Sequence, residues 1–264
     1  MPESQILVHR QGPIARVTLN RPEVHNAFDE HLIAALTELF EAFAEDGDLR
    51  CVLLTGAGRS FSAGADLSWM RRTAEYSEEA NLEDARRLER MLRTLDELPK
   101  PTIAMVNGAA MGGGVGLVAA CDIAIAAERA VFALSEVRLG LVPAVISPYV
   151  LRAVGIRACR RYFLTGERFD AAEARRIGLL HEVVAEAELE IRALDIAEAI
   201  LKGGPEALAD AKSLIRLSQS LEGSLLGEAT ARLIARRRAS AEGREGVAAF
   251  LEKRPPAWRG GREG

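Results

Sequence analysis

The chain has 264 residues, a formal net charge of −4 and a hydrophobic content of 48%, which suffices for one large domain or one domain with a smaller appendage. So mild a charge does not favour nucleic acid or an anionic membrane as the main partner. No stretch reaches the roughly 18 apolar residues of a membrane span, and the first residues lack an apolar run of signal-peptide length. We therefore expect a globular cytoplasmic protein.

Short apolar runs that end in turn residues predict strands in the first half of the chain. These runs cover residues 14–22, 49–58, 101–110 and 122–134, and the last is interpreted as two short strands around a polar turn. Apolar residues at helical spacing predict helices over 29–46 and 77–98. The strand–helix alternation repeats at roughly 40 to 50 residues, which indicates either a doubly wound sheet or a short spiral of repeated turns.

The second half of the chain is dominated by helical patterns. A helix that follows about Leu180 ends at Gly203-Gly204-Pro205, and Pro205 suits the first turn of the next helix. Only helical patterns follow from Glu206 to Lys253. We therefore divide the chain into a core over 1–200, which holds the site, and a helical oligomerisation region over 201–264.

The sequence offers no metal site. The three cysteines, Cys51, Cys121 and Cys159, lack metal-type spacing and lie among apolar neighbours, which predicts three reduced thiols. The four histidines are scattered and form no His-x-x-x-His pair. We therefore expect no bound metal ion.

Three consecutive glycines, Gly112 to Gly114, separate a predicted strand that ends near Val106 from the apolar helical pattern VGLVAAC. Glycines at a helix start leave N–H groups uncovered, and the positive end of the helix dipole lies there. Such a place stabilises an anion or a developing oxyanion, although close strand–helix packing would also require glycine. The spacing matches neither the nucleotide P-loop nor the dinucleotide fingerprint.

A second bend of small residues, Ala63 to Asp66, follows another predicted strand. Two strand-ending bends with bare N–H groups could converge on one oxygen atom. That arrangement is typical of an oxyanion hole, in which one donor contributes about 3 kcal/mol of transition-state stabilisation.

These two segments belong to a larger set of motifs, and the chain resembles the enoyl-CoA hydratase/isomerase (crotonase) superfamily from about residue 5 to 258. The motifs are, in chain order, LNRPEVHNAF, FSAGADL, VNGAAMGGGVGLVAACDIAIA, FALSEVRLGLVPA, LTGERFDAAEARRIGLLHEVV and FLEKRPPAW. The resemblance implies an α/β fold, a crotonase-like spiral of repeated ββα units with a helical C-terminal trimerisation region. It also implies an acyl-CoA thioester substrate, no separate cofactor, and a homo-oligomer that is a trimer or a dimer of trimers.

The resemblance assigns roles to individual positions. The backbone N–H groups of Ala65 and Gly113 would form the oxyanion hole, and Glu136 matches the catalytic glutamate. Positions that match CoA-binding residues are Val24, His25, Ala27, Ala63, Asp66 and Leu67, and those that match residues reaching a neighbouring subunit's CoA are Phe250 and Lys253. Ordinary loop or helix packing is the alternative for each of them.

One position departs from the hydratase pattern. A typical hydratase has a second glutamate two residues after the glycine triplet, where this chain has Gly116. Glu136 could perform both proton transfers through water, another group could take the second role, or the enzyme could be an isomerase that shuttles one proton with a single glutamate.

The resemblance to the methylglutaconyl-CoA or carboxygeranoyl-CoA hydratase-like branch favours hydration of a branched 2-enoyl-CoA such as 3-methylglutaconyl-CoA. Arg71 and Arg72 could pair with a second carboxylate on the acyl chain, although a solvated arginine pair is the commoner arrangement. Trp69 and Met70 could line the acyl pocket, or belong to the core.

A third hypothesis is a catalytically weak CoA- or RNA-binding protein. The densest basic run, Arg232 to Ser240, fits a solvated or subunit-facing helix better, so we expect no nucleic-acid partner.

Overall fold

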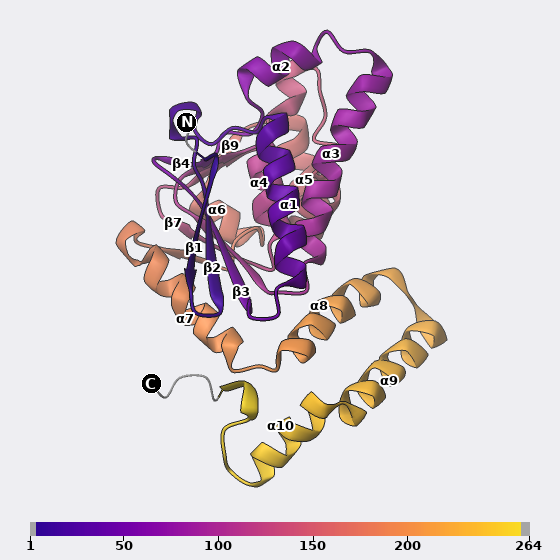
Figure 1. Ribbon diagram of the computed structural model, residues 1–264. Helices are drawn as coiled ribbons and strands as arrows, with labels where there is room; N and C mark the ends of the chain where they lie inside the picture. The colour runs from indigo at the N-terminus through magenta and orange to yellow at the C-terminus, as the bar shows by residue number, and fades with distance from the viewer. Residues whose placement is uncertain (1–3, 260–264) are drawn as a thin grey trace.

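The computed structural model describes residues 4–259, which form two β-sheets, a set of helices around them and a helical arm (Figure 1). The larger sheet has the strand order β1-β2-β3-β5-β7-β10. Its strands are Ile6–Gln11, Ile14–Leu19, Cys51–Gly56, Thr102–Val106, Ile123–Ala127 and Glu182–Val184. The β1–β2 pair is antiparallel, whereas every later pairing is parallel.

The smaller sheet has the order β4-β6-β8-β9, with strands Ser60–Ser62, Ala109–Met111, Val131–Ala133 and Arg168–Asp170. Strands β3, β5 and β7 of the large sheet are each followed at once by β4, β6 and β8 of the small one, and then by helical segments. Because both sheets pair in parallel from one such unit to the next, the chain advances as a spiral of ββα turns. The expected fold class is therefore confirmed, and the doubly wound alternative is wrong.

Helices cover both faces of the large sheet. On one face lie α1, α3, α4 and α5, which enclose the main core; they span Glu30–Glu45, Glu78–Glu97, Gly113–Ala120 and Ser147–Thr165. The other face packs against α7 (Leu189–Leu201) through a smaller cluster that includes Ile103, Ile125 and Ala193. The short helices α2 and α6, Leu67–Thr73 and Ala171–Arg176, and the 3-10 turns Pro22–Val24, Glu136–Leu139 and Glu186–Glu188 connect these elements.

Local sequence fixes the ends of the two helices that it predicted. Asp29 and Ser77 each accept a hydrogen bond from a first-turn amide of α1 or α3, as N-cap side chains do. Both helices therefore fall within the expected ranges. The run over 101–110 is two strands, because Asn107-Gly108 turns the chain from the large sheet into the small one.

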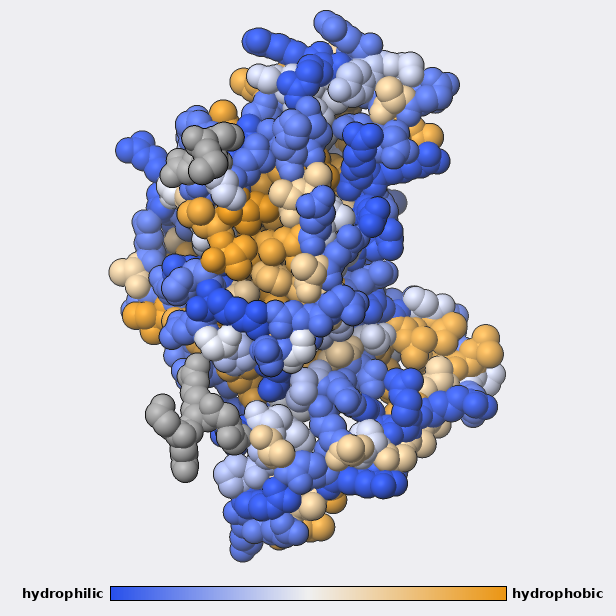
Figure 2. Space-filling model, in the orientation of Figure 1, coloured by the Kyte–Doolittle hydropathy of each residue, from blue (hydrophilic) through white to orange (hydrophobic). Residues whose placement is uncertain are grey.

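After α7 the chain leaves the core as an arm of three helices, α8 (Pro205–Ser220), α9 (Gly223–Ala239) and α10 (Ala241–Leu251), followed by a 3-10 turn at Ala257–Arg259. Figure 2 shows apolar surface where α8 meets α9. Ile215, Leu225 and Ile234 are between 50% and 69% exposed, although each is large and apolar. The boundary at residue 200 lies close to the end of α7 and remains a prediction.

Candidate active site

The two glycine-containing bends lie side by side. Strand β4 leads into Ala63–Asp66, and strand β6 leads into Gly112. Because the two strands pair in parallel, both bends lie at the same end of the small sheet. A Cβ atom placed on Gly64 would lie 2.8 Å from the Met111 carbonyl oxygen. The proximity that an oxyanion hole requires is therefore present.

Each glycine of the triplet faces a different neighbour. A Cβ atom on Gly112 would lie 3.0 Å from Glu136 Oε1, one on Gly113 would lie 2.7 Å from the Phe28 ring, and one on Gly114 would lie 2.5 Å from the Ser62 carbonyl oxygen. Gly112 also has φ 48° and ψ −115°, a conformation open mainly to glycine. The run thus serves close packing, while its role in stabilising an oxyanion stays a prediction.

The amides of Ala65 and Gly113 have no hydrogen-bond partner in the described part of the chain. Phe28 forms an isolated parallel bridge with Ala65, in which its N–H donates to Gly64 O at 2.6 Å and its carbonyl accepts from Asp66 N at 2.8 Å. Ala65 N–H therefore points away from Phe28. Gly113 is the first residue of α4, where amides have no helical partner. Neither amide donates a hydrogen bond to any group within residues 4–259.

Glu136 brings a carboxyl group to the same place. It begins the 3-10 turn after β8, the neighbour of β6 in the small sheet, and its Oε1 faces Gly112. Oε2 is buried and has no hydrogen-bond partner among the described residues. Burial raises the pKa of this carboxyl group, because the charged form loses hydration. A carboxyl group with a raised pKa beside two free amides is suited to moving protons during enolate chemistry.

The loop that follows β2 packs against the first bend. Asn26 is fully buried at φ 56°, and its side chain donates to Ala57 O at 2.9 Å and Ser60 O at 2.8 Å. His25 O accepts from Ala63 N at 2.9 Å, and the exposed His25 ring lies 3.1 Å from Ser60 Oγ. Val24 is half-buried and Ala27 is buried. The structure therefore brings this loop and the Ala63–Leu67 segment together, while their role in CoA binding stays a prediction.

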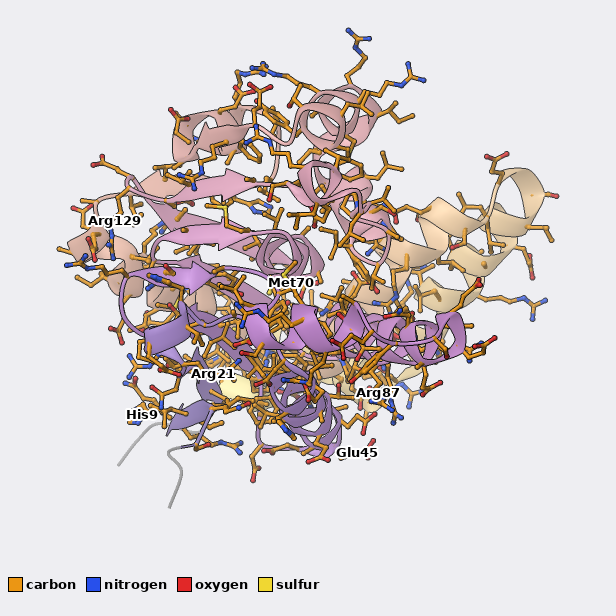
Figure 3. All side chains as sticks on the ribbon, turned by 90° about the horizontal axis from the view of Figure 1, so that it is seen from above. His9, Arg21, Glu45, Met70, Arg87 and Arg129 are labelled. Atoms are coloured by element: carbon orange, nitrogen blue, oxygen red, sulfur yellow. The ribbon has the colours of Figure 1, made fainter. Side chains whose placement is uncertain are left out.

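Asp66 has an internal role. Its Oδ1 caps α2 by accepting from Ser68 N and Trp69 N, and its Oδ2 lies 3.2 Å from Arg21. Burial alone would raise its pKa, but the two amides and Arg21 outweigh it and the pKa is lowered. Figure 3 shows Arg21 well inside the outline of the molecule, whereas Arg129 lies at its rim. Ala63 and Leu67 are exposed beside Asp66 and remain the more accessible candidates for contact with a ligand.

The remaining predicted residues lie elsewhere. Phe250 is 83% exposed on α10, and Lys253 is exposed just after it, both in the arm at the opposite end of the molecule from α2 (Figure 1). Within one subunit the structure does not bring them to Glu136.

Side chains around α2 are largely accounted for by internal contacts. Trp69 is 7% exposed and its Nε1 lies 3.3 Å from Asp84, so it belongs to the core, and Met70 is half-buried. Arg72 binds both carboxylate oxygens of Glu30 at 2.8 and 2.7 Å. Arg71 is exposed and makes no side-chain hydrogen bond within residues 4–259. Of this arginine pair, only Arg71 is available to a ligand.

The basic run on α9 is mostly neutralised. Arg232 pairs with Glu228, Arg236 with Asp210, and Arg237 with several acidic residues of the arm. This pairing gives no support to a nucleic-acid surface.

Sequence reasoning missed three contributors to this site. Phe28 bridges the first bend and covers Gly113, Arg21 ties Asp66 to Asp29, and Ile146 packs against Gly116. Arg21 lies between the turn residues Asn20 and Pro22, but its partner Asp66 is 45 residues further along the chain, so no local pattern indicated this ion pair. Phe28 and Ile146 look like ordinary core residues in the sequence.

Other expectations concern absences and the thiols. Cys51, Cys121 and Cys159 are free thiols. Within residues 4–259, no group of three or more metal-binding side chains comes together. In the same part of the chain, no helix has the length and hydropathy needed to cross a bilayer.

Comparisons with known proteins agree on one family. The profile described as "Enoyl-CoA hydratase/isomerase" matches residues 9–261. A protein of Escherichia coli named 2,3-dehydroadipyl-CoA hydratase is 36% identical over 261 residues, which are 97% of this chain and 99% of the relative. A putative enoyl-CoA hydratase of Thermus thermophilus is 36% identical over 248 residues, or 93% and 97% of the two chains.

Solved structures give the same result for the fold. A crystal structure of an enoyl-CoA hydratase from Shewanella pealeana has a TM-score of 0.93 to this chain at 45% identity, and the match covers 97% of this chain and 96% of that one. Since the family profile spans nearly the whole chain, and relatives above 30% identity match it end to end, the chain belongs to the enoyl-CoA hydratase/isomerase (crotonase) family of enzymes.

Proposed function

We propose that this enzyme adds water across the double bond of a 2-enoyl-CoA thioester, with Glu136 as the acid/base group. The observation that carries the proposal is the meeting of the Ala65 and Gly113 amides with the Glu136 carboxyl group at one end of the small sheet, where both amides and Glu136 Oε2 lack partners within residues 4–259. Two amides in adjoining bends can hold the thioester oxygen while negative charge develops on it.

In the proposed reaction, Glu136 starts as a carboxylate and takes a proton from water as the water oxygen bonds to Cβ. The electrons of the double bond move onto the thioester oxygen, where the two amides stabilise the enolate. The protonated Glu136 then returns its proton to Cα. The raised pKa of Glu136 makes its carboxylate a stronger base toward water and brings the group closer to neutral pH, where one group can both accept and donate a proton.

We propose that CoA lies against the two neighbouring loops that carry Val24, His25, Ala27, Ala63, Asp66 and Leu67. Phe250 and Lys253 would then come from a neighbouring subunit, since they lie far from the site of their own subunit. This arrangement requires a homo-oligomer, a trimer or a dimer of trimers, assembled through the arm that follows residue 200.

For the acyl group we propose a branched chain with a second carboxylate, such as 3-methylglutaconyl-CoA. The Escherichia coli relative is named for dehydroadipyl-CoA, which also carries a terminal carboxylate. Arg71 is a suitable partner, because it is exposed near the end of α2 and is not engaged, unlike Arg72.

The second candidate is an enoyl-CoA isomerase. It is favoured by the single carboxylate: position 116 is glycine, and one base can carry a proton between two carbons of the acyl chain. The two candidates differ in whether water enters the product.

The experiment is a panel of thioesters assayed with the purified enzyme. The panel holds crotonyl-CoA, 3-methylglutaconyl-CoA and matching 3-enoyl-CoA thioesters, and mass spectrometry scores products 18 Da heavier separately from isomers of equal mass. A hydrated product from 2-enoyl substrates, lost in Glu136→Gln, supports the proposal. Migration of the double bond without a mass increase would replace hydratase by isomerase.

A further inference from the structure

The packing around Gly116 accounts for the absence of a second glutamate at that position. Gly116 lies on α4 one helical turn after the N-cap residue Gly112, and its N–H donates to Gly112 O at 3.1 Å. A Cβ atom on Gly112 would face the Glu136 carboxylate, and one on Gly116 would overlap the Ile146 Cγ2 methyl group and lie 2.9 Å from Ile146 Cβ. The space that a side chain at 116 would occupy is therefore filled.

Ile146 is held in that space by its backbone. It is the N-cap residue of α5, and its carbonyl oxygen accepts from Tyr149 N at 3.2 Å and Val150 N at 3.1 Å. The side chain is 3% exposed, and Leu92 of α3 closes the other side at 3.7 Å from the position of a Gly116 Cβ. Moving Ile146 aside would thus require the start of α5 to shift.

The surroundings would also oppose a charge at this position. Ile146, Leu92 and the α4 residues Val115 and Leu117 are apolar and buried. A carboxylate placed among them would lie beside apolar side chains rather than hydrogen-bond donors, which disfavours its charged form.

The geometry points to Ile146 as the residue that commits this site to a single carboxylate, by occupying the volume that an acidic side chain at position 116 would need. This inference rests on the proposed acid/base role of Glu136, but it holds whether the reaction adds water or moves a double bond. It predicts that positions 116 and 146 change together: a side chain at 116 is tolerated only when the one at 146 is shortened.

The first arm of the test measures folding and needs no substrate. Gly116→Ala adds only the Cβ atom, and we expect it to lower Tm by about 5 °C because the methyl group has no room. Ile146→Ala alone leaves a cavity and also lowers Tm. In Gly116→Ala/Ile146→Ala the added methyl group enters that cavity, so the double variant should be more stable than the sum of the single effects predicts. Additive losses, or a Gly116→Ala protein as stable as the wild type, would overturn the inference.

The second arm measures proton transfer in Gly116→Glu/Ile146→Ala. The wild-type profile of kcat/KM against pH should show one ionisation on its acidic side, from Glu136. The double variant should show a second carboxyl ionisation, and Glu136→Gln in that background should retain at least tenfold more activity than Glu136→Gln alone. A double variant that folds but shows one ionisation, and no such rescue, contradicts the inference.

The outcomes separate this inference from the proposed function. If Glu136→Gln retains full wild-type activity, the acid/base assignment fails whatever the Tm coupling shows. If Glu136→Gln is inactive but the two positions do not couple, the assignment stands and the role of Ile146 fails.

Discussion

The two ends of helix α4 differ in whether the polar groups around them have hydrogen-bond partners. At its start, Gly113 N–H, Ala65 N–H and Glu136 Oε2 lack partners within the described residues. At its end, Asp122 is engaged through one oxygen: its Oδ2 accepts from Thr102 N at 2.7 Å and Thr102 Oγ1 at 2.9 Å, and lies 2.7 Å from Lys212 Nζ. The polar groups at the two ends of α4 thus differ within residues 4–259: those at the start are unpartnered, and those at the end are paired.

The second end of α4 has a structural role. Lys212 on α8 is 8% exposed and also donates to Lys100 O at 3.1 Å, so this network joins the starts of β5 and β7 to the arm. A cavity of about 290 Å³ adjoins it, lined by residues that include Cys121, Tyr149 and Arg216. The comparison teaches that the cavity with charged walls lies at the end of α4 whose polar groups are paired, away from the candidate active site.

The largest expected effect comes from removing the acid/base group at the start of α4. Glu136→Gln keeps the shape but cannot exchange a proton, so kcat should fall by about 10³–10⁴-fold. Titration calorimetry with a non-reactive acyl-CoA should show binding within a few-fold of the wild type. Glu186→Gln, an exposed glutamate far from the site that pairs with Arg129, is the control and should leave kcat unchanged. Full activity in Glu136→Gln would refute the assignment.

A second prediction moves the two amides apart. Gly64 has φ 86°, and an added Cβ atom would lie 2.8 Å from Met111 O, so Gly64→Ala should separate the bends. Losing the contribution of one donor corresponds to about 3 kcal/mol, or a kcat about 10²-fold lower. Gly155→Ala is matched to it, because Gly155 has φ 74° but nothing lies within 4 Å.

Both alanine variants carry the same kind of backbone strain, so unfolding in denaturant should show comparable strain-related losses in stability. Only Gly64→Ala should lose kcat. Equal kcat losses in the two variants would show that strain, rather than separation of the amides, is responsible.

A third prediction concerns the opposite end of the helix. Asp122→Asn leaves Lys212 buried without its anionic partner, and the free energy of unfolding should drop by about 2–3 kcal/mol. Urea denaturation measures this change. Because the network lies away from Glu136, kcat of the folded variant should equal that of the wild type. A large loss of kcat without a loss of stability would contradict a purely structural role for the network at the end of α4.

The smallest expected effect is a gain in stability. Since burial raises the pKa of Glu136 above that in the unfolded chain, the folded state binds more protons at intermediate pH, and this group costs stability as pH rises through its folded-state pKa. Glu136→Gln should therefore be more stable than the wild type at pH 7, by about 1 kcal/mol. The difference should vanish below the ordinary pKa of a glutamate, which urea curves at both pH values will test. A gain that persists at low pH would assign the effect to packing instead.

The sequence by itself determined the strand–helix alternation, the helix boundaries at Asp29 and Ser77, and the family, because turn residues, caps and family motifs are local signals. The ββα order of the units came only through the family resemblance. It also pointed to Ala65, Gly113 and Glu136 as residues of one site, through the resemblance. Patterns along the chain carry this information because strand alternation, helix spacing and capping depend on near neighbours.

Only the tertiary structure decided how these pieces meet. That Gly112, Gly113 and Gly114 face three different partners, and that Arg72 is engaged by Glu30, depends on contacts between segments tens of residues apart. The same holds for Ile146, thirty positions from Gly116 in sequence yet packed on it in space. Side-chain packing in a close-packed interior is set by the whole fold. No local pattern could therefore have shown beside which glycine another residue occupies the space that a side chain would need.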